Sequence, residues 1–286
     1  MKFSVLSAQC SILLLAASLC RADAPLEVTL VSEVTSIQPG KPFYAGLHLH
    51  HGEGYHSYWK CPGIVGVPTG IQWSLPRGFA AGEIEWPEPE PVLMFKIKAQ
   101  GFERDVVLPV KITPPARLKA GEIVKLGGKA SWMSCARTCH PGFTDVSLEL
   151  PVKNEAPALN DKWHAMFDKE RSRIARTTDA WKATATESGQ TVTLTLSPAS
   201  VSARKITSEQ EAAKIIFFTE DGWIDSDKPQ AVKLNADSSL TITLTRSDIY
   251  LGKEPPRTLV GLVQDSEGWC VDAKLTSMKI APELRR

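Results

Sequence analysis

The sequence predicts an all-β protein, built as an antiparallel β-sandwich followed by a second, smaller β domain with one helix at the junction. Three observations predict this class. Many short segments alternate apolar and polar residues with a period of two, which is the pattern of half-buried strands. Proline and glycine turn signals separate these segments at short intervals. The chain has 286 residues, which exceeds a typical single domain of about 100–150 residues.

The first 22 residues are typical of a secretory signal peptide. They combine a weakly positive start, an apolar run over residues 12–19, and small residues around a cleavage point after Ala22. Leu19 fits badly in front of Cys20 if that cysteine were to be a lipoprotein anchor. We therefore expect a mature protein that begins at residue 23 and is periplasmic or secreted.

The rest of the chain gives no sign of a membrane span or of a nucleic-acid partner. No run of about 18 or more apolar residues follows the signal segment, so no spanning helix is expected in the mature chain. Lysine plus arginine (33) nearly balance aspartate plus glutamate (32). Such a balance offers no electrostatic reason to bind nucleic acid or an anionic membrane surface.

The first domain is expected to cover residues 23–153. Alternating segments predict its strands at residues 26–31, 44–50, 70–75, 106–112, 122–126 and 146–152. Turn signals fall at residues 38–40, 75–78 and 113–115. The proline-rich residues 86–91 predict an edge loop or rim, because proline is a poor residue for a central strand.

The second domain is expected to cover residues 154–286. It begins with a linker over residues 154–160, and Asn160 or Asp161 is a candidate cap for a helix that runs to about Arg176. Trp163, Met166, Phe167 and Ile174 roughly follow one stripe of that helix. Further strands are predicted at residues 191–196, 214–218, 231–234, 240–245, 258–263 and 270–275.

Four cysteines remain once Cys10 and Cys20 leave with the signal peptide: Cys61, Cys135, Cys139 and Cys270. An even number in an exported chain favours disulfides over free thiols. Four cysteines allow three pairings, and the sequence alone does not choose among them.

Cys135 and Cys139 lie in the stretch SWMSCARTCHPG, separated by three residues. Two cysteines close in space are what disulfide exchange needs, because one thiolate attacks and the other resolves the mixed disulfide. The alternative is a permanent local brace, although so short a loop adds little chain-entropy stabilisation. Lys129, Arg137 and a protonated His140 are the cations that would lower the pKa of such a thiol if they lay close to it.

A metal site is the third interpretation of this pair. Zinc or Cu(I) at two thiolates needs one or two more soft or imidazole ligands. His140 is adjacent in sequence, and a second group of histidines lies at residues 48–56. Histidines in an exported domain are more often ordinary surface or core side chains, so we expect no metal and no cofactor.

Cys61 and Cys270 are the candidates for a structural disulfide. If Cys135 pairs with Cys139, these two remain for each other, and their bridge would close a loop of roughly 200 residues between the domains. Two buried thiols that never meet, or Cys61 beside the redox pair, are the alternatives. Other enzyme signatures, such as G-x-S-x-G, a Walker loop, H-E-x-x-H or a dinucleotide fingerprint, are missing from the sequence.

Three stretches together carry a family resemblance. GYHSYWKCPG at residues 54–63 resembles a G-[WY]-H-[ST]-Y-W-K-N-P-G segment, and it is followed by VPT, IQWSLPRGF and IEWP between residues 67 and 87. The third stretch is SWMSCARTCHPG with the strand at residues 146–152 behind it. This order resembles the N-terminal periplasmic domain of the DsbD family of thiol:disulfide interchange proteins. The branch that it resembles includes the suppressor-of-copper-sensitivity membrane reductases.

The resemblance covers residues 26–152 well and residues 160–286 more weakly, through FFTE at 217–220 and PQ at 229–230. It implies an immunoglobulin-like β-sandwich whose cysteine pair relays electrons to oxidised periplasmic partners. Carried onto this chain, Cys135 and Cys139 become that pair. In full-length members a membrane domain and a thioredoxin-like domain supply the electrons.

Two departures from the family pattern affect these expectations. The sequence ends at Arg286 without a membrane or thioredoxin-like segment, so the electron donor is expected to be a separate thioredoxin-like or membrane protein. Cys61 stands where the family pattern has asparagine. The leading hypothesis is an exported thiol–disulfide carrier, a component of a protein-disulfide reductase system. One alternative is a non-catalytic binding module with structural disulfides, which would present the His48–His56 region or the proline-rich rim to a partner or to copper. Another is a chaperone-like sandwich without a redox role.

Overall fold

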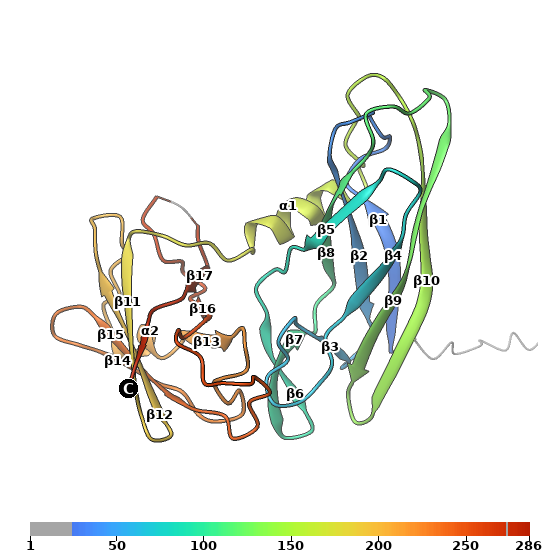
Figure 1. The fold of residues 1–286 in the computed structure, drawn as a ribbon. Helices are drawn as coiled ribbons and strands as arrows, with labels where there is room; N and C mark the ends of the chain where they lie inside the picture. The colour runs from blue at the N-terminus through green and yellow to red at the C-terminus, as the bar shows by residue number, and fades with distance from the viewer. Residues whose placement is uncertain (1–24, 273) are drawn as a thin grey trace, which may run out of the picture.

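The structure is a computed structural model, and it describes residues 25–272 and 274–286. The predicted signal peptide and its cleavage point after Ala22 lie outside the described residues. Figure 1 shows two lobes side by side, each built mainly from strands. We call residues 25–152 the first lobe and residues 181–286 the second lobe. The predicted all-β class is confirmed, because strands are the main regular structure of both lobes and the two helices are short.

The first lobe is a sandwich of two sheets. One sheet has the antiparallel order β1-β2-β8-β5. Its strands are β1 (Leu26–Ser32), β2 (Phe43–His51), β8 (Val106–Thr113) and β5 (Ala80–Ile84). The other has the order β10-β9-β3-β7-β6, and β4 also pairs with β9. Its strands are β10 (Cys139–Pro151), β9 (Ile123–Cys135), β3 (His56–Tyr58), β7 (Ile97–Phe102), β6 (Glu90–Met94) and β4 (Gly70–Ser74).

Alternation along the strands explains the core between these two sheets. In β1, Leu26, Val28 and Leu30 are buried while Glu27 and Thr29 are exposed, because successive side chains of a strand point to opposite faces. The core includes the fully buried side chains Trp59, Phe102, Leu47, Leu108 and Leu126. Burial of apolar surface at about 25 cal/mol per Å² is the main source of stability for such a sandwich.

A long hairpin, β9–β10, forms one margin of the second sheet (Figure 1). Its register is continuous from Ile123 opposite Pro151 to Cys135 opposite Cys139. The sequence predicted only the parts of these strands far from the turn, at residues 122–126 and 146–152. The structure extends both strands to the cysteines, so that the hairpin turns at residues 136–138.

The second lobe contains two smaller sheets around one core. Their strand orders are β14-β15-β12-β11-β18 and β13-β16-β17. The strands are β11 (Trp181–Ser188), β12 (Thr191–Pro198), β13 (Ile216–Thr219), β14 (Ala231–Leu234), β15 (Leu240–Thr245), β16 (Gly261–Gln264), β17 (Ser277–Ile280) and β18 (Leu284–Arg285). Leu194, Ile242, Phe217 and Val263 from both sheets share this core with Trp269.

The helix at the junction, α1 (His164–Ser172), is shorter than the predicted helix and packs on the first lobe. Phe167 is fully buried and contacts Val31 and Val107 of the first sheet. Glu170 is also buried, and it accepts two hydrogen bonds from Arg104 at 3.0 and 3.1 Å. A second short helix, α2 (Glu209–Ala212), begins after Ser208, whose hydroxyl accepts from the Glu211 N–H.

Several elements differ from the sequence prediction. Strands β3, β5, β6, β7, β11, β17 and β18 were not predicted, and the described residues 270–272 and 274–275 do not form the predicted strand. In that segment Trp269 is held in the core by its indole N–H, which donates to the Val263 carbonyl at 2.9 Å, and Val271 faces solvent. The proline-rich segment leads into β6, which is the edge strand of its sheet, a place where the missing N–H of Pro91 is tolerated.

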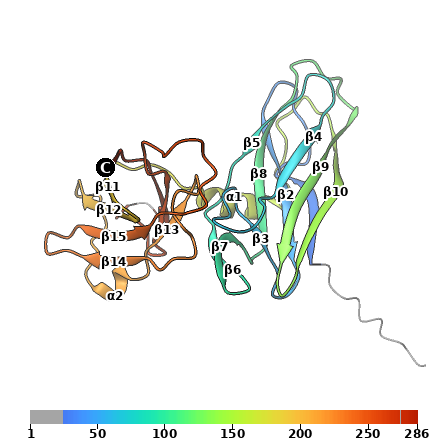
Figure 2. The same ribbon diagram turned by 60° about the horizontal axis from the view of Figure 1, so that its bottom comes forward.

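The lobes are joined by polar contacts at the base of the β6–β7 hairpin, which lies between them in Figures 1 and 2. The buried Gln100 amide donates to the Thr219 carbonyl at 2.9 Å and accepts from the Thr219 N–H at 2.8 Å. Glu88 accepts from the hydroxyls of Thr276 and Ser277 at 2.8 and 2.7 Å. The side chains of Gln100 and Glu88 therefore connect the lobes by hydrogen bonds, where, among the described residues, no strand of one lobe pairs with a strand of the other.

Candidate functional site

The turn of the β9–β10 hairpin brings Cys135 and Cys139 together as a disulfide. The two residues are direct partners in the antiparallel ladder, with their Cα atoms 4.1 Å apart. Inside the turn, the Ala136 N–H donates to the Thr138 carbonyl at 3.1 Å. The three-residue spacing seen in the sequence is therefore the loop that closes a hairpin between two paired cysteines.

The two cysteine residues differ in their exposure to solvent. Cys135 is 0% exposed, whereas Cys139 is partly exposed. Thiol exchange requires that an incoming group reach one sulfur in line with the disulfide bond. The geometry therefore presents Cys139 to an incoming partner and shields Cys135.

Cys135 belongs to a small apolar cluster separate from the main core of the first lobe, which we call the cysteine cluster. It contains Tyr58, Val92, Ala99 and Cys135, with Val65, Met94, Met133 and Cys139 packed against them. Alternation explains why these residues meet. In β9, β3 and β7 the intervening residues Ser134, Ser57 and Phe102 point to the opposite face of the sheet.

Two glycines allow the strands and loops of the cysteine cluster to come close. A Cβ on Gly66, which has φ of 103°, would lie 2.3 Å from the Tyr58 ring. A Cβ on Gly101 would lie 2.1 Å from the Ser57 carbonyl oxygen. The loop at Gly66 can therefore lie directly on Tyr58, and β7 can pair tightly with β3.

A buried histidine lies beside the cysteine pair. His56 is directly opposite Cys135 in the β3–β9 ladder and is 2% exposed. Its Nε2 lies 3.3 Å from the Tyr58 hydroxyl oxygen. Burial lowers the pKa of His56, because a charged imidazole is disfavoured away from water.

The surface beside the hairpin turn is hollowed. A cavity of about 500 Å³ is lined by the turn residue Arg137, by Tyr55 and His56, and by Glu53, Leu93 and Glu103 from neighbouring segments. His140 is exposed next to Cys139, and its Nε2 lies 2.8 Å from the Thr138 hydroxyl oxygen. The approach to Cys139 is therefore a mixed surface with acidic, basic and apolar groups.

Of the cations expected near the thiols, Lys129 lies elsewhere. It precedes Cys135 by six residues of the same strand, a separation of about 20 Å. Its ammonium lies 4.6 Å from the centre of the Phe143 ring on the outer side of the hairpin. Arg137, by contrast, is part of the turn itself.

The predicted bridge between Cys61 and Cys270 is not formed, and both cysteines are free. Cys61 packs against the core of the first lobe, and its carbonyl accepts from the Gln100 amide. Cys270 packs against the core of the second lobe, with its sulfur 3.5 Å from the Thr178 hydroxyl oxygen. Each thiol is held by a different core, which is why the two do not meet. Burial raises the pKa of the Cys61 thiol.

The histidines at residues 48–56 do not converge on one point. His50 lies 2.9 Å from Asp105 and His48 lies 3.7 Å from the same carboxylate, whereas His51 lies 2.8 Å from the Ser57 hydroxyl. Within residues 25–272 and 274–286, no group of three or more His, Cys, Asp or Glu residues is placed to hold a metal ion. In the same ranges, no helix is both long enough and apolar enough to cross a membrane.

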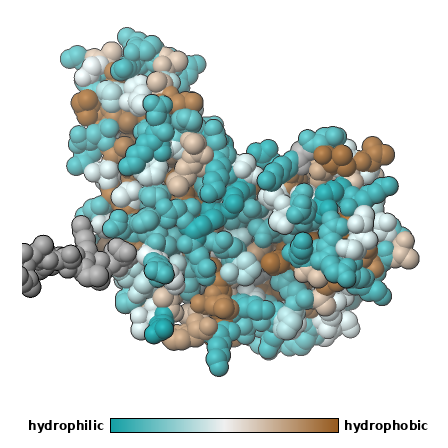
Figure 3. Space-filling model, turned by 180° about the vertical axis from the view of Figure 1, so that it is seen from behind, coloured by the Kyte–Doolittle hydropathy of each residue, from teal (hydrophilic) through white to brown (hydrophobic). Residues whose placement is uncertain are grey.

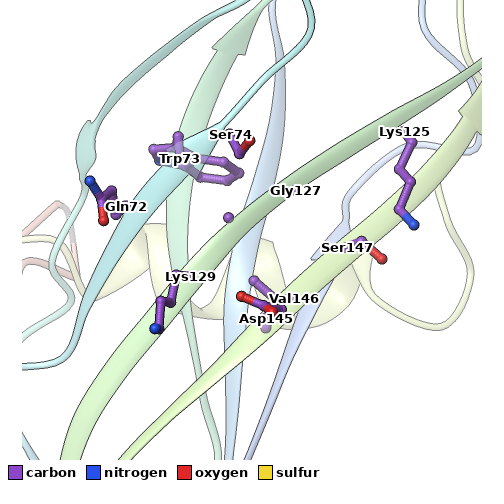
Figure 4. Close-up of a pocket in the computed structure, with 10 residues that line it drawn as sticks. Gln72, Trp73, Ser74, Lys125, Gly127, Lys129, Asp145, Val146 and Ser147 are labelled. Carbon is purple, nitrogen blue, oxygen red and sulfur yellow. The ribbon is translucent and has the colours of Figure 1, made fainter.

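A wider groove of about 650 Å³ crosses the outer face of β4, β9 and β10 (Figure 4). Trp73, Lys125 and Asp145 line it, and Gly127 leaves its floor open. It contains no cysteine or histidine, so it offers none of the groups that thiol exchange needs. The opposite side of the molecule in Figure 3 is largely hydrophilic, with small separate hydrophobic patches.

Sequence reasoning found both cysteines of this site but missed the groups around them. Tyr58 and His56 stood in the quoted stretch YHSYWKCPG, yet the short strand β3 was not predicted. The β6–β7 hairpin contributes Val92, Met94 and Ala99. It was not predicted, because the proline-rich segment before it is unfavourable for a central strand. The alternating triplet His-Ser-Tyr was the available signal, because it places His56 and Tyr58 on one face.

Comparisons with known proteins find one matching family model and one solved structure of similar fold. Residues 23–151 match the family model described as thiol:disulfide interchange protein DsbD, N-terminal. The chain is similar to the crystal structure of the N-terminal periplasmic domain of ScsB from Proteus mirabilis, with a TM-score of 0.60 and 17% identity over 92% of this chain and 95% of that one. A protein of unknown function from Porphyromonas gingivalis W83 aligns over 91% of this chain and 100% of its own at 12% identity, but its TM-score of 0.25 is too low to support a shared fold. No curated protein matches the chain in sequence.

Proposed function

We propose that this chain, whose residues 23–151 match the family model of the DsbD N-terminal domain, is a thiol–disulfide interchange protein whose Cys135 and Cys139 alternate between disulfide and dithiol. The observation that carries the proposal is the asymmetric burial of the bonded pair, with Cys135 enclosed and Cys139 partly exposed. Partial exposure of one cysteine supports the proposal, because disulfide exchange requires that an incoming thiolate reach one sulfur.

The proposed reaction passes two electrons from the reduced pair to a partner disulfide. The Cys139 thiolate attacks one sulfur of the partner, a Cys139–partner disulfide forms, and the partner's other sulfur leaves as a thiolate. Cys135, as a thiolate, then attacks the Cys139 sulfur. The Cys135–Cys139 bond forms, the Cys139–partner bond breaks, and the second partner sulfur leaves as a thiolate. The two protons lost by the pair end on the two partner thiolates.

The electron donor in this scheme is a separate dithiol protein of the thioredoxin-like or membrane type, which reduces the Cys135–Cys139 bond by the reverse steps. The acceptors are oxidised exported proteins. The predicted signal peptide and the match to the DsbD N-terminal family model support both partners and a site of action in the periplasm, because disulfides persist in that compartment.

Trapping of mixed disulfides tests the function. In the native host, a Cys135→Ser variant keeps the exposed Cys139 but has no resolving thiol, so it should accumulate disulfide-linked partners that reductant releases. Cys139→Ser should trap far less, because its remaining thiol is buried. Cys61→Ser serves as the matched control and should trap nothing beyond the unmodified chain.

The reduction potential of the Cys135–Cys139 pair distinguishes an exchanging pair from a structural bridge. A pair that exchanges electrons should have a potential above that of structural bridges, which typically lie below about −300 mV. A potential below that value, together with no captured partner in either variant, would show that the bond is a permanent brace.

A further inference from the structure

We propose that His56 takes the proton from the Cys135 thiol during the resolving step and returns it when the pair is reduced. The inference rests on the proposed function of the cysteine pair. It assigns to a buried histidine a role in the reaction of the shielded sulfur, which has no direct path to solvent.

The sheet register places the two side chains together. His56 and Cys135 are Cα partners in the antiparallel pairing of β3 with β9. Directly opposed residues project to the same face, with their Cβ atoms about 4.5–5.5 Å apart. Tyr58, two residues along β3, projects to the same face and contacts Cys135 within the cysteine cluster. The imidazole, the phenol and the sulfur therefore occupy one side of the sheet.

The Cys135 thiol needs a nearby base because it is 0% exposed. Only the thiolate is a competent nucleophile, and apolar surroundings make it harder to form. Water, the usual acceptor of a thiol proton, does not reach this sulfur. A group inside the cluster must accept the proton at the moment when Cys135 attacks.

His56 has the properties that such a base requires. It is itself buried, and it is held by the Tyr58 hydroxyl at one ring nitrogen, which leaves the other nitrogen to exchange a proton. Its lowered pKa keeps the imidazole neutral at neutral pH, so that it is ready to accept. Burial raises the pKa of Tyr58 to about 12, so the phenol stays protonated and acts as a hydrogen-bonding partner.

The other titratable groups around the pair are placed differently. His51 faces Ser57 on the opposite side of the sheet, at 2.8 Å. His140 lies next to Cys139 in β10 and contacts the Thr138 hydroxyl and the Tyr55 ring. His56 also lines the cavity at the hairpin turn, together with the charged residues Glu53, Glu103 and Arg137.

The resolving step then balances as follows. In the mixed disulfide, the Cys135 S–H bond gives its proton to His56, and the resulting thiolate attacks the Cys139 sulfur. The Cys135–Cys139 bond forms while the Cys139–partner bond breaks, and its electron pair leaves on the partner thiolate. The imidazolium gives its proton to that thiolate or to solvent. When a donor dithiol reduces the pair, Cys135 leaves as a thiolate and takes a proton back from His56.

Ellman's reagent, 5,5′-dithiobis(2-nitrobenzoate), separates the two steps in the purified protein. Reaction at Cys139 releases one coloured thiolate, and attack by Cys135 on the resulting mixed disulfide releases the second. The experiment uses the reduced protein with Cys61→Ser and Cys270→Ser, so that only the pair reacts. His56→Gln is the test variant, and His140→Gln is the matched control because that histidine adjoins the exposed cysteine.

The expected result is selective. At neutral pH, His56→Gln should slow the second release by about 100-fold, the lower end of what a positioned general base contributes, and should change the first release by no more than about 3-fold. The second release should then rise steadily with pH, as expected for attack through hydroxide alone. His140→Gln should leave the second release unchanged. A second release with the same rate and pH profile in His56→Gln as in the parent would overturn the proposal.

An NMR measurement with His56 in place tests the proposal even if the His56→Gln variant does not fold. The NMR titration of the His56 ring protons should change when the pair goes from disulfide to dithiol, because a neighbouring thiol or thiolate alters the imidazole pKa. An identical titration in both states would also overturn the proposal. Failure of this inference differs from failure of the function: if no mixed disulfide forms at Cys139, the function fails, whereas an unaffected second release removes only the role of His56.

Discussion

Adjacent residues of one strand contribute to the cysteine cluster and to the junction between the lobes, but they make different types of contact. In β7, Ala99 packs against the cluster around Cys135, whereas Gln100 bonds the backbone of Thr219 in the second lobe. The first contact is apolar and encloses the disulfide-bonded Cys135. The second is a set of directional hydrogen bonds, which favour one arrangement of the two lobes. One strand thus links the proposed redox site to the junction between the lobes.

The cysteines of the two regions show what this difference means for reactivity. Cys135 and Cys139 share a hairpin turn, so that breaking or forming their bond changes a short local loop. Cys61 sits at the junction in a buried setting that raises its pKa and keeps its thiol protonated. Whether a cysteine can take part in disulfide exchange therefore depends less on the number of cysteines in the chain than on the solvent exposure of each sulfur and on the groups that surround it.

The largest expected effect separates the two regions by function. Replacing the nucleophile of a covalent mechanism typically removes nearly all turnover, so Cys139→Ser should lower the rate of electron transfer to a model disulfide by at least about 100-fold. Cys61→Ser should change that rate by less than about 2-fold. Single-turnover reduction of oxidised glutathione by the pre-reduced protein measures both. Equal losses in the two variants would place Cys61 in the reaction and erase the distinction.

A second prediction concerns the support. Gln100→Ala leaves the N–H and carbonyl of Thr219 and the carbonyl of Cys61 without their partner. Each buried group left unpaired costs about 1–3 kcal/mol, so the free energy of unfolding should fall by about 3–4 kcal/mol in denaturant titration. Gln72→Ala, on the exposed face of β4, is the matched control and should change it by less than about 0.5 kcal/mol. Similar values for both variants would mean that the junction contributes little to stability.

A third prediction uses His51, a buried histidine at the end of β2 in the other sheet of the first lobe. Burial lowers the pKa of His51 from its ordinary value of 6.5 to about 4. Because the unfolded chain binds this proton more tightly, stability from His51 is present above about pH 6.5 and is lost as the pH falls toward 4. At 1.36 kcal/mol per pKa unit, the loss is at most about 3 kcal/mol. His51→Gln should flatten this part of the stability profile, while the exposed His140→Gln should not. An unchanged profile in His51→Gln would assign the acid sensitivity to other groups.

The sequence was most informative for strands in which the alternation of apolar and polar residues matches the alternation of buried and exposed side chains. Alternation located β1, β2, β4 and β8 closely, because a strand with one face in a core must alternate. The same argument missed β3, whose three residues are all buried between two covered faces. It also failed at residues 270–275, where the burial of Trp269 in the second core decides the chain path.

For the site, the sequence identified Cys135 and Cys139 but did not reveal which sulfur is enclosed. That depends on the β6–β7 hairpin and on the loop at Gly66, which are separate from the cysteines in sequence and are brought to them by sheet pairing. The bridge between Cys61 and Cys270 was expected by elimination from an even cysteine count. Elimination ignores the two separate cores that hold these side chains apart.

The smallest expected effect tests whether the outer face of the hairpin belongs to the site. Phe143 is 72% exposed, and the Lys129 ammonium lies over its ring at 4.6 Å. An exposed cation–π contact contributes about 0.5–1 kcal/mol, so Phe143→Ala should lower the free energy of unfolding by less than about 1 kcal/mol and leave the rate of the cysteine pair unchanged. Leu93→Ala is the informative counterpart, because Leu93 lines the cavity beside the turn. If partners approach over that cavity, Leu93→Ala should weaken partner capture by Cys135→Ser while Phe143→Ala does not; the reverse result would move the approach to the outer face of β9 and β10.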